Sequence, residues 1–152
     1  MRIAVAAVWL ALAVPGLAAD GAWVAFYRDG NNSAAFERSS IAPDSVNILS
    51  VQPKNMYSGL VVSWDIKTQV HRFDCANNTY RLLTKKFYDQ SGKLTSDDTA
   101  VVVAMNDAFK DRWHPVDTDT LRKASGLVCA KAEPAPAKPF GSMQEALAWM
   151  AN

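Results

Sequence analysis

Cysteine and histidine are the residue types in this chain best suited to covalent or metal-centred chemistry, and there are only two of each: Cys75, Cys129, His71 and His114. His71 and Cys75 are four residues apart, so on a regular strand they lie on one face but about 13 Å apart. That distance exceeds the hydrogen bond that a catalytic Cys–His pair needs. Two histidines are also too few for an ordinary zinc site. No Gly-x-Ser-x-Gly, phosphate-loop or Cys-x-x-Cys motif is present. We therefore expect no enzyme activity, no metal and no cofactor.

The first residues have the form of an export signal. One cation, Arg2, precedes an apolar run over residues 3–14, and a small-residue site ending in Ala18 and Ala19 follows. The apolar run is too short to span a bilayer, although a retained membrane anchor is the alternative interpretation. We predict a signal peptide over residues 1–19 and an exported mature chain, periplasmic, secreted or at the cell surface, with no stable membrane span.

Export determines how the two cysteines are interpreted. Two lone thiols in an oxidising compartment are expected to pair, which predicts one disulfide between Cys75 and Cys129. The bond would close a segment of 54 positions and stabilise the fold by about 4 kcal/mol. A reactive free thiol is the alternative.

Length and charge define the class of protein further. Removal of 19 residues leaves a chain long enough for one ordinary domain. Only Arg2 is lost from the 16 basic residues, so the mature chain balances the 15 acidic residues. A neutral protein lacks the long-range attraction that nucleic acid or an anionic membrane requires, so we expect no nucleic-acid partner. A local basic patch remains compatible with this balance.

Most of the chain up to residue 103 has the pattern of β-strands separated by turn residues. Strands are expected at 23–27, 33–41, 46–51, 60–66, 80–88 and 93–103, with a break at 52–55. The stretch 70–75 either continues the strand before it or forms another one. Residues 80–88 also fit one face of a helix, but the turn residues on both sides favour a strand. Consecutive strands with short turns predict an antiparallel sheet.

Two helices are expected after the strands. Asp117, Thr118 or Asp119 can cap the first, which runs to Val128. Residues 132–141 are rich in Pro and Ala, as in a semi-rigid linker, and residues 142–152 form a short amphipathic helix that begins at a capping box. This change in composition predicts that folding is complete by Cys129. The terminal helix either docks on the domain, which we favour, or binds a partner.

These features amount to a resemblance to a known family. The motifs that carry it are Phe73-Asp74-Cys75 followed by Tyr80-Arg81-Leu82, Trp113-His114-Pro115-Val116, and Val128-Cys129. In this order, over most of residues 20–131, the chain resembles the surface-adhesin protein E family of Gram-negative bacteria. The resemblance implies an α+β domain: one antiparallel sheet of about five or six strands, a C-terminal helix packed on it, and a Cys75–Cys129 disulfide. It also implies display at the cell envelope and adhesion to host extracellular proteins. This chain lacks the lipidated cysteine expected of the family's lipoproteins.

The candidate binding residues are cations near the predicted turn at Asn77-Asn78. They lie on two adjacent predicted strands and are Arg72, Arg81, Lys85 and Lys86, with His71 beside them. A shared stripe of charge would suit an acidic protein partner, either extracellular or in the envelope. An ordinary solvated sheet face is the alternative interpretation of these residues. The alternative function is a periplasmic small-ligand-binding or envelope-accessory module, and the sequence leaves the oligomeric state open.

Overall fold

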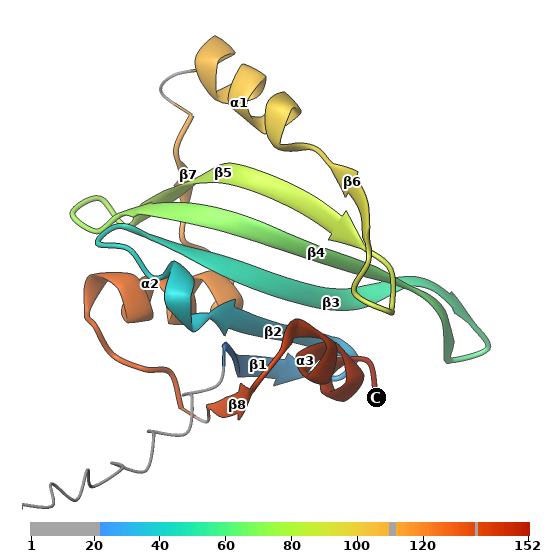
Figure 1. Ribbon diagram of the computed structural model, residues 1–152. Coiled ribbons are helices and arrows are strands. Elements are labelled where there is room, and N and C mark those ends of the chain that lie inside the picture. Colours follow the sequence, from blue (N-terminus) through green and yellow to red (C-terminus); the bar gives the residue numbers. More distant parts are fainter. Residues whose placement is uncertain (1–21, 110–111, 136) are drawn as a thin grey trace, which may run out of the picture.

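A computed structural model describes residues 22–109, 112–135 and 137–152. The expected α+β class is confirmed: the described chain is one antiparallel sheet with three α-helices and a Cys75–Cys129 disulfide (Figure 1). The sheet has eight strands, more than the five or six expected, in the order β6-β5-β4-β3-β2-β1-β8, with β7 paired to β5. The predicted signal peptide lies outside the described residues.

The strands are β1 (Trp23–Asp29), β2 (Asn32–Glu37), β3 (Ser45–Tyr57), β4 (Leu60–Asp74), β5 (Thr79–Tyr88), β6 (Leu94–Asp97), β7 (His114–Pro115) and β8 (Lys138–Phe140). The helices are α1 (Thr99–Ala108), α2 (Asp119–Cys129) and α3 (Met143–Met150), and one turn of 3₁₀ helix covers Arg38–Ser40. Residues 70–75 therefore continue β4 as far as Asp74, and residues 80–88 are the strand that the flanking turns favoured.

The sheet is covered on both faces, which gives the protein two separate hydrophobic cores. Residues 23–26 of β1 and 34–36 of β2 are all apolar and buried, and neighbouring ones point to opposite faces, so each strand contributes to both cores. On the first face, here called the α2 face, Val24, Phe36 and Ile48 pack with Leu121 and Val128 of α2. On the second, here called the α3 face, a different set packs with α3: Trp23, Ala25, Ala35, Leu49, Val51, Ile66, Ala146, Leu147 and Met150.

Helix α2 and the disulfide agree with the sequence analysis. The Thr118 side chain caps the helix by accepting a hydrogen bond from the Leu121 amide at 3.3 Å. Cys129 ends the helix, and Cys75 directly follows β4, with 5.6 Å between their Cα atoms. The bond therefore fastens α2 to the end of a central strand.

The expected break at residues 52–55 is wrong, because β3 runs on to Tyr57. The pairing of β3 with β2 ends at Val51. Proline cannot donate a backbone hydrogen bond, but no strand lies on that side of Pro53 to accept one. A register shift between Pro53 and Asn55 absorbs the irregularity. At the far end, Ser58 and Gly59 both have positive φ and close the hairpin to β4.

The expected strand over residues 93–103 is also wrong in its second half. The strand β6 ends at Asp97, whose carboxylate accepts a hydrogen bond from the Thr99 amide at 3.0 Å at the start of α1. Of the valines at 101–103, only Val102 is buried, whereas Val101 and Val103 are exposed. The β-branched run indicated a strand, but the local hydrogen bond and the packing of Val102 favour a helix.

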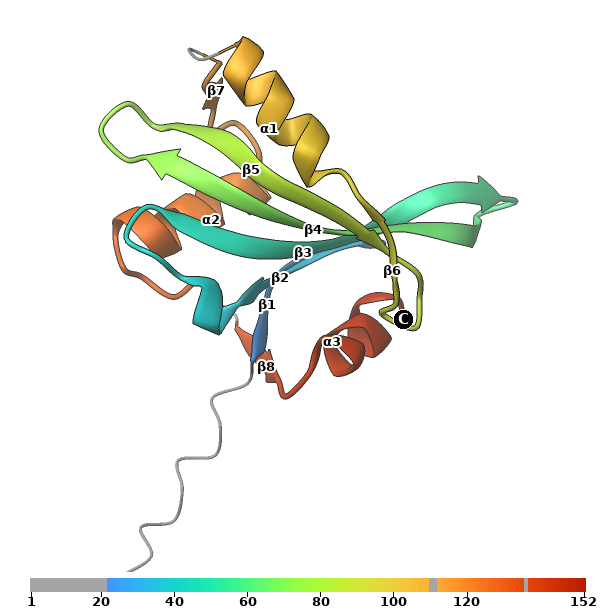
Figure 2. The same ribbon diagram turned by 45° about the horizontal axis from the view of Figure 1, so that its top comes forward.

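The C-terminal segment completes the fold, contrary to the expectation that folding ends at Cys129. Part of the expected linker forms β8, which pairs with β1 through Trp23 and Phe140. Helix α3 docks on the sheet as favoured, with Leu147 and Met150 at 2% and 1% exposure. Helix α3 lies beside β1, β2 and β8, whereas α2 contacts mainly β3 and β4 at another part of the sheet (Figures 1 and 2).

Candidate binding surfaces

Strand register divides the four predicted cations between the two faces of the sheet. Arg72 lies directly opposite Arg81, and Thr68 lies opposite Lys86. Thr68 and Arg72 are two and six residues after Ile66, which belongs to the second core, so they lie on its face of the sheet. Their opposite residues, Lys86 and Arg81, therefore share the α3 face with Arg72. We call these three residues the cationic face.

Lys85 belongs to the opposite face. The pairing of β4 with β5 shifts between Val70 and His71, which leaves Leu83 without an opposite residue. This bulge reverses the alternation of β5, so Lys85 lies opposite Gln69 on the α2 face, where its amine is 4.8 Å from the centre of the Phe87 ring. No residue type marks this bulge, so the prediction that placed Lys85 with Arg72, Arg81 and Lys86 on one face is wrong for Lys85.

Two of the three cations have carboxylate partners. Arg72 Nε is 2.6 Å from Asp44 Oδ2, and Lys86 Nζ is 3.5 Å from Asp97 Oδ2. Arg81 lies over the Trp113 ring instead, with its Cζ atom 5.6 Å from the ring centre. Its buried Nε has no hydrogen-bond partner among the residues that the structure describes. Among the residues that the structure describes, Arg81 is therefore the cation of this face for which no carboxylate partner is found.

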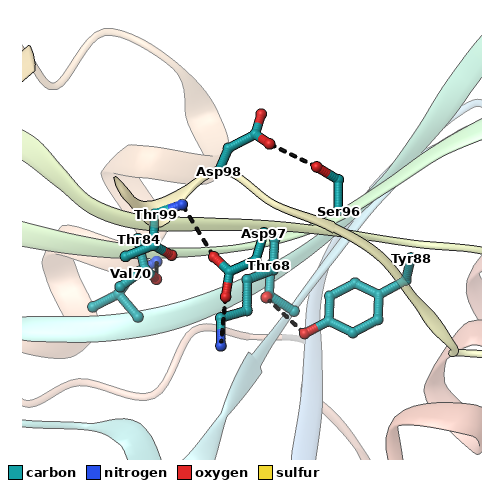
Figure 3. A network of polar contacts seen from close by, with 9 residues as sticks. Thr68, Val70, Thr84, Tyr88, Ser96, Asp97, Asp98 and Thr99 are labelled. Atoms are coloured by element: carbon teal, nitrogen blue, oxygen red, sulfur yellow. Dashed lines mark hydrogen bonds and ion pairs between the residues drawn. The ribbon is translucent and has the colours of Figure 1, made fainter. Parts of the chain in front are cut away.

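A polar network holds the edge of the cationic face in place (Figure 3). Asp97 accepts a hydrogen bond from Thr99 and pairs with Lys86, and hydrogen bonds from Thr99 lower the pKa of the Asp97 carboxyl. The Thr84 hydroxyl accepts from the Val70 amide at 3.3 Å beside the bulge. The carboxylate of Asp97 thus stays charged and close to Lys86.

His71 lies on the α2 face and is buried, so it does not belong to the cationic face. Burial lowers the pKa of its imidazole to about 4, which makes the ring neutral near pH 7. In that state Nδ1–H donates to the Gln69 carbonyl at 3.2 Å. The rings of His71 and His114 both pack against Tyr80. Beside His71 is an open groove of about 250 Å³, lined mainly by polar residues: Ser50, Gln52, Lys67, Gln69, Thr118 and Thr120.

The hairpin of β3 and β4 forms a second candidate surface, which the sequence analysis missed. Figures 1 and 2 show this hairpin projecting beyond the rest of the sheet. Four large apolar side chains at its end are exposed, and we call them the hairpin tip: Met56 at 54%, Tyr57 at 76%, Leu60 at 73% and Val62 at 64%. The two-residue turn Ser58-Gly59 between apolar residues was the available signal.

Helix α1 also carries exposed apolar residues. Its inner side buries Val102 and binds β5 through Asn106, whereas Val101, Val103, Met105 and the following Phe109 are exposed.

Neither a membrane-spanning helix nor a metal-binding cluster occurs among the residues that the structure describes. No helix among them is long and apolar enough to cross a membrane. They also contain no group of three or more His, Cys, Asp or Glu side chains that could hold a metal ion. Comparison of the chain with family models, with curated proteins and with solved structures finds no match. The function must therefore be argued from the chain's own surfaces.

Proposed function

We propose that this protein is an exported, non-enzymatic binding protein, similar in role to the surface-adhesin protein E family, and that it recognises an acidic extracellular or envelope protein. The observation that carries the proposal is the direct opposition of Arg72 and Arg81 across β4 and β5. Like charges in directly opposed positions destabilise a sheet. Asp44 already offsets the charge of Arg72, so a carboxylate contributed by a partner would relieve the remaining repulsion by pairing with Arg81.

Arg81 is the central contact in this proposal. The Trp113 ring restricts the guanidinium, so little side-chain freedom is lost when a carboxylate binds it. A planar guanidinium can donate two parallel hydrogen bonds to one carboxylate. Arg72, at 53% side-chain exposure and paired with Asp44, and Lys86, at 41% and paired with Asp97, are the exposed cations on the same face.

The expected contribution of each charge is small. Exposed ion pairs each contribute roughly 0.2–1 kcal/mol, so the cationic face should act mainly on the association rate and its salt dependence. The Cys75–Cys129 disulfide supports a location outside the cytoplasm, where such a partner would be met.

A periplasmic small-ligand-binding module is the second candidate. The groove beside His71 favours it, since several hydroxyl and amide side chains converge there on a buried neutral imidazole. Binding of a small polar ligand would then be independent of the cationic face.

The test compares partner capture by two double variants of equal charge. Arg72→Gln/Arg81→Gln removes the opposed pair, and Lys93→Gln/Lys131→Gln removes two exposed cations elsewhere. We expect captured envelope or extracellular proteins to associate more slowly with the first variant, with a weaker dependence on salt, and unchanged with the control. Equal association rates for the wild type and both variants, with the fold intact, would exclude the cationic face.

A further inference from the structure

The outer half of the β3–β4 hairpin stands apart from the sheet. Pairing of β3 with β2 ends at Val51, and pairing of β4 with β5 begins at Ile66. Residues 52–65 therefore form a two-stranded arm whose strands pair only with each other. At about 3.3 Å per residue, each strand of this arm extends roughly 20 Å.

The end of the arm is apolar on both faces. Met56 lies opposite Val61, and Tyr57 lies opposite Leu60. Since successive residues of a strand point to opposite faces, these two pairs place apolar side chains on each side of the ribbon. A hairpin that docks on another protein needs only one apolar face. Apolar side chains on both faces of the hairpin end are instead suited to insertion into an apolar medium.

The charges and aromatic residues of the arm are consistent with such a medium. Lys54 is the only charged residue from Gln52 to Trp64, so no carboxylate would have to enter an apolar phase. Asp65, at the base of the arm, is 2.8 Å from Lys67 Nζ and is neutralised there. Tyr57, at 76% exposure, has the amphipathic ring that is enriched at membrane–water interfaces.

We propose that the hairpin tip inserts into the interfacial layer of a lipid bilayer. The depth is limited by the outer edges of the arm, whose backbone groups are not paired to another strand and cannot enter the hydrocarbon core. The apolar end beyond Asn55 and Ser63 is about three residues long, or roughly 10 Å, which matches the depth reached by interfacial segments. Lys54 lies behind this end, at the level of the lipid phosphates.

This activity is separate from the proposed recognition of an acidic protein. The cationic face and the hairpin tip share no residue, so the two can be tested independently. Membrane attachment through the tip would hold the protein at a lipid surface while the cationic face remains free.

The experiment measures flotation of the purified protein with lipid vesicles. One set contains phosphatidylcholine alone, and the other has about one-third phosphatidylglycerol to supply anionic phosphate. Mass spectrometry must show the same N-terminus in every sample, because a retained apolar leader would bind vesicles by itself. Tyr57→Asp/Leu60→Asp changes the tip, and Val101→Asp/Val103→Asp is the control, since it places the same charges on exposed apolar positions of α1.

We expect the wild type and the α1 control to float with vesicles, and the tip variant to partition about tenfold less. All four substituted positions are exposed, and circular dichroism checks that the fold is kept. Leu60→Ser provides a milder change if the aspartate variant misfolds. A Leu60→Trp variant reports depth directly, because brominated lipid should quench its fluorescence.

Three results would overturn the proposal. The wild type does not float with either vesicle set, or the tip variant floats as well as the wild type. Alternatively, sedimentation shows that the tip drives self-association without lipid, which would make it a contact between copies of the chain.

Discussion

Asn106 of helix α1 donates a hydrogen bond of 2.7 Å from its side-chain amide to the backbone carbonyl of Leu82, in the middle of β5. This strand has β6 along one part of its outer side and β7 along another, and Leu82 lies between them. Helix α1 thus covers the stretch of β5 that neither short strand pairs. An uncovered edge would be a template for pairing with other chains.

Asn106→Ala should destabilise the fold by about 1–3 kcal/mol, because the partly buried Leu82 carbonyl would lose its partner. The measurement is urea unfolding, combined with hydrogen exchange at the amides of α1. Asp107→Ala, at the exposed neighbouring position, is the control. Equal stability of the two variants would mean that Asn106 does not hold α1 on the strand.

Stability should fall as the pH falls from about 6.5 to about 4, because His71 resists protonation in the folded state. The unfolded chain binds a proton in this range and the folded chain does not, so the loss reaches about 3 kcal/mol at the lower end. Urea unfolding at several pH values measures it. His71→Phe should flatten this slope. A slope that persists in His71→Phe would assign it to another group.

Leu147→Ala should destabilise the protein by about 2–5 kcal/mol, since Leu147 is almost fully buried against the sheet. Removal of the chain after Lys131 should be more severe, because it deletes both β8 and α3. Thermal unfolding measures both effects, and Gln144→Ala on the exposed side of α3 is the control. An unchanged midpoint after truncation would restore the view that folding ends at Cys129.

The double variant Cys75→Ser/Cys129→Ser should lose about 4 kcal/mol of stability, because the disulfide closes a segment of 54 residues. Urea unfolding of the oxidised wild type and of this variant provides the comparison. Thiol labelling of the purified wild type should find no free cysteine. Two reactive thiols, or a covalent dimer, would contradict an intrachain bond.

The sequence was a reliable guide wherever local pattern and chemistry agree. Thr118 capped α2, the strand over residues 80–88 lay between strong turn signals, and the pairing of Cys75 with Cys129 required only that no other cysteine exists. It was wrong at Val101 and Val103, where β-branched residues occupy a helix that the edge of the sheet holds in place. The Pro-Ala composition also hid the strand β8.

For the candidate surfaces, the sequence by itself determined which side chains carry charge and which are apolar. Tertiary structure alone decided their placement. A one-residue bulge at Leu83 moved Lys85 to the opposite face from Arg81, and no residue type marks such a bulge. The ends of β2 and β5 left Tyr57 and Leu60 projecting into solvent, although their residue types are equally suited to a core. Exposure depends on which other strands lie alongside, and that is a property of the assembled sheet.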